Sequence, residues 1–87
     1  MNPKTLHQAA MKLDPNALKI YTFITSVQAM ENKPYIVMTH SLIAADTGIS
    51  LAQVKYYTDQ LVHDGWLQRE EHIIAGQRAT AYSSVFF

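Results

Sequence analysis

Apolar residues recur at helical spacing along the first two thirds of the chain. The strongest case follows Asp14 and Pro15, because Asp caps free backbone amides and Pro suits the first helical position. The apolar stripe after them consists of Ala17, Ile20, Ile24 and Val27, widened by Leu18, Tyr21 and Phe23. This pattern predicts a core helix that ends near Glu31, where the segment ENKPY breaks it.

A shorter amphipathic segment precedes this helix. Asn2 and Pro3 can open a helix that reaches about Lys12. Its apolar positions are Leu6, Ala9, Ala10 and Leu13. We therefore expect residues 1–13 to form an N-terminal helical extension.

Two further helices are predicted on either side of a short turn. The segment SLIAADT can be capped by Thr39 or Ser41 and ended by Gly48 in a left-handed conformation. Ser50 then caps a helix over about 51–63. Two helices joined by a three- to four-residue turn with a Gly are the helix-turn-helix signature. The preceding YIVM segment is either a small strand or an extended entry to the first of these helices.

The periodicity changes after Gly65. The runs WLQREEHII and ATAYSSVFF flank AGQR, which predicts a β-hairpin with a short loop. We therefore predict an α+β fold that is mainly helical, a winged helix-turn-helix with a three-helix core plus a β-hairpin wing. An extra N-terminal helix is added to it, and one domain spans residues 1–87.

The helix predicted at 51–63 carries two adjacent tyrosines that cannot face the same way, because neighbours on a helix lie about 100° apart. The positions within about 60° of an inward Val54 are Leu51, Tyr57, Thr58 and Leu61. The opposite side holds Ala52, Tyr56, Asp59 and His63, with Gln53, Lys55 and Gln60 on the flanks. We therefore expect Tyr57 in the core and Tyr56 in solvent.

The exposed side of this helix carries residue types that contact DNA. In helix-turn-helix proteins the second helix enters the major groove, and its N-terminal half meets base edges. Gln53 can pair with adenine, Lys55 can approach guanine or a phosphate, and Tyr56 can donate to a phosphate. Arg78 on the wing can reach a phosphate or the minor groove. The candidate DNA-binding residues are Thr39, Ser41, Ser50, Gln53, Lys55, Tyr56, Gln60, Gln77 and Arg78.

These candidates also have plain structural interpretations. Tyr56 can be an ordinary surface aromatic that packs on its own helix, since single exposed aromatics are common. Thr39 and Ser41 can act only as helix caps, and Gln77 and Arg78 can belong to an ordinary solvated turn.

The charge balance limits how such a domain binds nucleic acid. Lys plus Arg equal Asp plus Glu at seven each, so the net charge is zero. Strong non-specific binding depends on excess positive charge and is therefore disfavoured. We expect about four to six phosphate contacts per protomer, with help from dimerisation or a second protein.

No residue pattern indicates catalysis or a bound metal. The chain has no Cys, its four His show no short ligand spacing, and its three Gly form no phosphate-binding loop. We expect no catalytic residues, no metal and no cofactor. The start of the chain lacks the apolar core of a secretion signal, and no apolar run approaches the roughly 20 residues that span a bilayer. We expect a soluble cytoplasmic protein without a membrane partner.

The segments AQVKYYTDQLVHDGWLQRE and QRATAY resemble the small winged-helix regulators of fimbrial operons, the PapI and FaeA type. In that family a recognition helix carries a basic residue before a tyrosine pair and is followed by a Val-Gln-Arg-like strand. The matching residues here are Gln53, Lys55, Tyr56, Tyr57, Leu61, Gly65, Gln68, Arg69, Ala79, Thr80 and Tyr82. The resemblance implies that Lys55 and Tyr56 contact DNA and that the protein adjusts transcription with a larger DNA-bound partner.

Two functions are consistent with these patterns. The first is a sequence-specific transcriptional regulator of bacterial, plasmid or phage origin that binds double-stranded DNA through the helix at about 50–63 and the wing. Its further partners would be a larger DNA-bound regulator or a second copy in a homodimer. The alternative is a winged helix that acts as a protein-protein interaction module without direct DNA reading. Tyr56 and the apolar ends of the chain, including the final VFF, would then be interface anchors.

Overall fold

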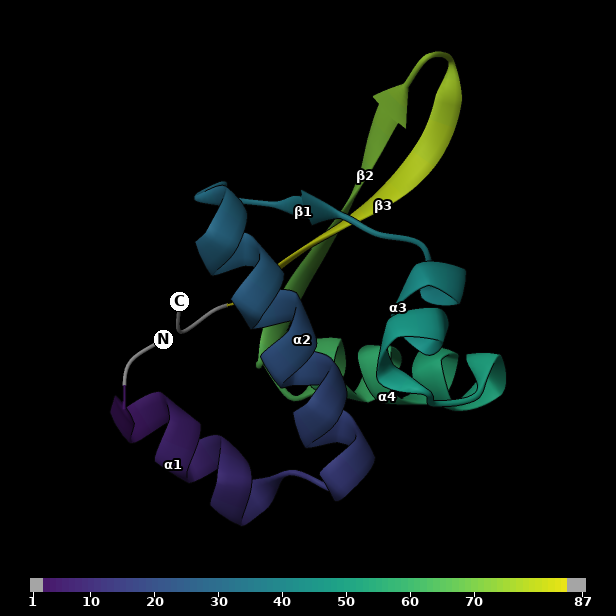
Figure 1. Ribbon diagram of the computed structural model, residues 1–87. Helices are drawn as coiled ribbons and strands as arrows, with labels where there is room; N and C mark the ends of the chain where they lie inside the picture. Colours follow the sequence, from purple (N-terminus) through teal and green to yellow (C-terminus); the bar gives the residue numbers. More distant parts are fainter. Residues whose placement is uncertain (1–2, 85–87) are drawn as a thin grey trace.

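The computed structural model describes residues 3–84, with side chains from His7 onward, and Figure 1 shows their arrangement. The elements are α1 (Pro3–Lys12), α2 (Pro15–Glu31), β1 (Ile36–Val37), α3 (His40–Thr47), α4 (Leu51–His63), β2 (Leu67–Ile74) and β3 (Gln77–Ser84). This order confirms the predicted mainly helical α+β fold, a winged helix with an added first helix. Asn2, the side chain of Leu6 and the final VFF segment lie outside the described residues.

The core lies between α2, α3, α4 and the base of the hairpin, and the hairpin extends well beyond it (Figure 1). The largest apolar and aromatic side chains that are fully buried are Ile20, Tyr21, Ile24, Ile43, Val54, Leu61, Leu67 and Tyr82. Trp66 is half-buried, and its ring meets that of Tyr21 edge-on at 5.5 Å between centroids. Trp66 therefore closes the core, and α1 joins the core through Ala9.

Side-chain caps begin three of the helices. Asp14 accepts a hydrogen bond of 2.9 Å from the amide of Asn16 and caps α2. Ser50 accepts one of 3.3 Å from the amide of Gln53 and caps α4. Of the two candidates for α3, Thr39 is the cap, because its hydroxyl accepts from Leu42 at 3.0 Å.

Within the described residues the strands form one antiparallel sheet in the order β1-β3-β2. The YIVM segment contains a short strand, in which Ile36 lies opposite Tyr82. The predicted AGQR loop is wrong in its second half, since Gln77 and Arg78 already belong to β3. The turn is Ala75-Gly76 with φ of 53° and 77°, and two successive positive φ values match the twist of the strands that they join.

The predicted rotation of α4 is confirmed for most of its length. Val54, Thr58 and Leu61 are buried, Tyr57 is half-buried against the core, and Tyr56 is 58% exposed. The expectation for Leu51 is wrong, because this residue is 43% exposed at the very start of the helix. Ile49, just before the cap, enters the core instead together with Val54, which is the arrangement of a hydrophobic staple.

Candidate nucleic-acid interface

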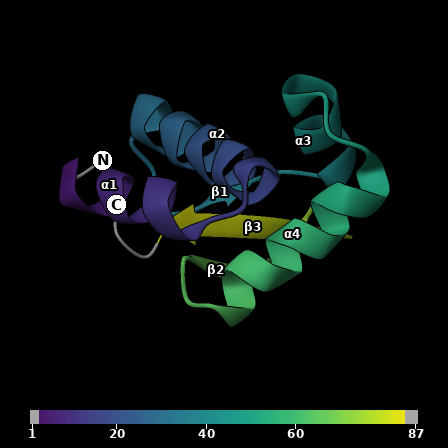
Figure 2. The same cartoon turned by 90° about the horizontal axis from the view of Figure 1, so that it is seen from below.

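The outer side of α4 is open to solvent over its whole length. Seen from below, α4 lies across the molecule, with α3 beside its N-terminal end and α1 on the other side of the structure (Figure 2). All five candidates near or on this helix are exposed, namely Ser50, Gln53, Lys55, Tyr56 and Gln60. The hydroxyl of Ser50 is already engaged as the cap of α4.

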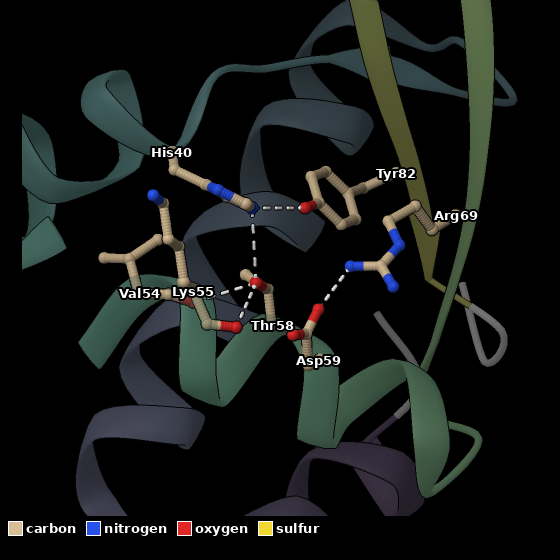
Figure 3. Close-up of polar contacts among 7 residues, drawn as sticks. All are labelled: His40, Val54, Lys55, Thr58, Asp59, Arg69 and Tyr82. Atoms are coloured by element: carbon tan, nitrogen blue, oxygen red, sulfur yellow. Dashed lines mark hydrogen bonds and ion pairs between the residues drawn. The ribbon is translucent and has the colours of Figure 1, made fainter. Parts of the chain in front are cut away.

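The five candidates do not share one face. Tyr56 and Gln60 line a hollow of about 270 Å³ together with Lys12, Leu13 and Asp14, where α1 joins α2. Lys55 lies on the other flank, and its side chain extends toward His40 (Figure 3). The helix therefore presents Lys55 toward the start of α3, and Tyr56 toward the junction of α1 and α2.

Tyr56 is in contact with its neighbour. Its ring meets that of Tyr57 edge-on, with 5.1 Å between centroids and 79° between planes. Burial raises the pKa of Tyr57, and the nearby carboxylate of Asp14 raises it further. Part of the Tyr56 ring is thus used in packing, although 58% of the residue stays open to a partner.

A groove of about 490 Å³ separates the start of α3 from the hairpin. Thr39 lines it on the helix side, and Gln77 and Arg78 line it on the strand side. All three are exposed, so the fold brings Thr39 close to two candidates that lie far from it in the sequence. Ser41 is exposed on α3 but is not among the residues that line this groove.

The two arginines of the hairpin, Arg69 and Arg78, each lie within ion-pair distance of a carboxylate. Nη1 of Arg78 lies 3.9 Å from Oε2 of Glu71, and both side chains are largely exposed. Nη1 of Arg69 lies 2.6 Å from Oδ1 of Asp59 on α4. Among the described residues Lys55 has no carboxylate within ion-pair distance, so its charge is the unneutralised one at this end of α4.

A polar cluster that was not predicted joins α3, α4 and the sheet (Figure 3). Nε2 of His40 lies 2.9 Å from the hydroxyl of Tyr82 and 3.4 Å from Oγ1 of Thr58. Thr58 in turn donates to the carbonyl of Val54 at 2.8 Å. Burial lowers the pKa of His40, and the charges of Lys55 and Arg69 also lower it, against an opposite effect of Asp59. The only sequence signal was the position of His40 at a helix start.

Within residues 3–84, no three His, Asp or Glu side chains come together as metal ligands would. No helix in this range combines the length and the apolar character needed to cross a bilayer.

Comparison with known proteins finds a similarity of fold but no match of sequence. No protein-family profile matches the chain, and no curated protein sequence matches it. A solved structure of a "possible transcriptional regulator" from Methanosarcina mazei Go1 has a similar fold, with a TM-score of 0.62 and 14% sequence identity. The match covers 97% of this chain and 66% of that one. This likeness shows that the winged-helix fold is shared.

Proposed function

We propose that the chain is a transcriptional regulator that binds duplex DNA with the N-terminal half of α4 in the major groove. The observation that carries the proposal is the exposed charge of Lys55, unpaired among the described residues. This residue is exposed on the predicted recognition helix, and no carboxylate neutralises it within the described part of the chain. A free cation on an exposed helix beside a wing is suited to a guanine edge or a phosphate.

The groove between α3 and the hairpin supports a second contact with the same DNA. Thr39, Gln77 and Arg78 line it together with His40, the residue toward which the side chain of Lys55 extends. Gln53 and Tyr56 would meet base edges or phosphates beside Lys55, while Ser50, Ser41 and Gln60 would make peripheral contacts. The similar fold of a protein described as a possible transcriptional regulator agrees with this role.

Binding of a fluorescent mixed-sequence duplex at low salt tests the proposal. Lys55→Glu should weaken binding by about tenfold or more, because it removes one favourable contact and adds a repulsive charge. The matched control is Lys33→Glu, an equal charge change in the exposed segment after α2, which should leave affinity within about twofold of wild type. Equal affinities for the two variants would contradict the proposal.

We propose that a homodimer or a larger DNA-bound regulator adds affinity, since the net charge is zero. Sedimentation with and without duplex measures whether one or two copies bind. A bacterial, plasmid or phage origin remains part of this proposal.

The second candidate function is a protein-protein interaction module. It is favoured by the hairpin, where Ile73 is 77% and Ile74 51% exposed while the neighbouring Arg78 is accompanied by Glu71. Ile73→Lys and Ile74→Lys, made together, should abolish capture of a protein partner if this function is correct. They should leave duplex binding intact or stronger if the first proposal is correct.

A further inference from the structure

Asp59 lies four residues after Lys55, the spacing at which opposite charges interact across one turn of a helix. Both residues are exposed on α4, so nothing in the helix itself prevents that pair. The carboxylate instead points to the hairpin, with Oδ1 at 2.6 Å from Nη1 of Arg69 (Figure 3). The side chain of Lys55 extends the other way, toward His40 (Figure 3).

Arg69 is held in place from the sheet. It lies opposite Tyr82 in the register of β2 and β3, and Tyr82 is fully buried. Hydrogen bonding to Asp59 raises the pKa of Arg69 against the lowering effect of burial, and Tyr82 raises it further. The guanidinium is charged, as arginine side chains in proteins are. Its side chain is 35% exposed and that of Asp59 is 64% exposed, so the ion pair lies at the surface where the hairpin meets α4.

We propose that Arg69 is a positioning residue for DNA binding: it holds the carboxylate of Asp59 and thereby leaves the ammonium of Lys55 available to DNA. This inference rests on the proposed function. Without Arg69, Asp59 would be an unpaired negative charge one turn from Lys55 on the face offered to phosphates. It would then attract Lys55 and repel the DNA backbone.

A double-variant cycle tests this role, with duplex affinity and its salt dependence as readouts. Arg69→Gln should weaken binding about five- to tenfold, the effect of losing about one phosphate contact, and should lower the salt slope by about one. Asp59→Asn in the Arg69→Gln background should restore wild-type affinity within about twofold, because the freed carboxylate is gone. If Arg69 touched DNA directly, the double variant would stay as weak as Arg69→Gln, and the inference would be overturned.

The controls separate this inference from the proposed function. Glu31→Gln removes an exposed carboxylate at the end of α2 and should not rescue Arg69→Gln, whereas rescue by it would point to general charge and overturn the inference. Melting by circular dichroism establishes that each variant is folded. Absence of duplex binding by the wild type would overturn the proposed function itself. Wild-type binding with an unchanged Arg69→Gln variant would overturn only the role of Arg69.

Discussion

The hydroxyl of Tyr82 lies 2.9 Å from Nε2 of His40 and so joins the first residue of α3 to the central strand of the sheet. His40 is half-buried, and Tyr82 is fully buried. A neutral imidazole can accept this hydrogen bond through Nε2, whereas a protonated one can only donate. The contact therefore links the position of α3 beside the wing to the protonation of one side chain.

Stability should fall below neutral pH because of His40. Burial, with Lys55 and Arg69, holds its folded pKa below the ordinary value of 6.5, so the unfolded chain binds the proton first. The contribution is fully present above about pH 6.5 and is lost as the pH falls toward the folded pKa. Between about pH 7.5 and 5.5, the wild-type Tm should decrease more steeply than that of His40→Gln.

The matched control for this titration is His7→Gln, which removes an exposed imidazole from α1. Its Tm should follow the wild-type slope. Parallel slopes for wild type and His40→Gln would show that His40 has no such effect.

Gln28 should be among the polar residues that matter most for stability. It is 2% exposed, its amide nitrogen donates to the carbonyl of Pro34 at 3.0 Å, and its oxygen accepts from the amide of Ser84 at 2.9 Å. Gln28→Ala should lower the free energy of unfolding by about 2–4 kcal/mol, because it leaves a cavity and a buried amide without its partner. Urea denaturation measures this loss. Gln8→Ala, at an exposed position of α1, should change stability by less than about 0.5 kcal/mol.

Removing the hydroxyl of Thr39, the cap of α3, should cost more stability than removing that of Ser41. Thr39→Ala should cost about 1 kcal/mol of unfolding free energy, because the amide of Leu42 loses its acceptor. Ser41→Ala should cost almost nothing, since its side chain does not cap the helix. Equal losses in urea denaturation would mean that both hydroxyls serve as caps.

A glycine in the hairpin turn should make the protein more stable. Ala75 has a φ of 53°, a left-handed conformation that is unfavourable for a residue with a Cβ atom. Ala75→Gly should therefore stabilise the protein by about 0.5–1 kcal/mol, visible as a higher Tm. Ala79→Gly, inside β3, should have the opposite sign because Gly weakens a strand. A lower Tm for Ala75→Gly would contradict this account of the turn.

Local patterns predicted the elements of the fold but not its polar connections. The bounds of α4 follow from its Ser50 cap and its apolar period, whereas Leu51 was placed in the core because periodicity does not tell where a helix first meets other elements. The predicted AGQR loop is longer than the observed Ala75-Gly76 turn, because nothing in the sequence indicates that Ala75 adopts a positive φ. Residues from different helices and strands form the contacts of Asp59 with Arg69, His40 with Tyr82 and Gln28 with Ser84.

The candidate site was predictable to a similar degree. Helical rotation was sufficient to place Lys55 and Tyr56 in solvent. It could not tell that Lys55 extends toward α3 while Tyr56 faces the junction of α1 and α2, because the neighbours of each flank are set by tertiary packing. The same applies to the groove shared by Thr39 and Arg78.

Amide chemical shifts recorded during titration with duplex DNA at low salt test the central claim most directly. We expect shifts confined to residues 50–60 at the cap and along α4, to residues 39–41 at the start of α3 and to residues 75–79 on the hairpin. The amides of α1 before Lys12 should remain unchanged. Absence of shifts at saturating duplex, or shifts that avoid Lys55 and its neighbours on α4, would contradict DNA binding through this helix.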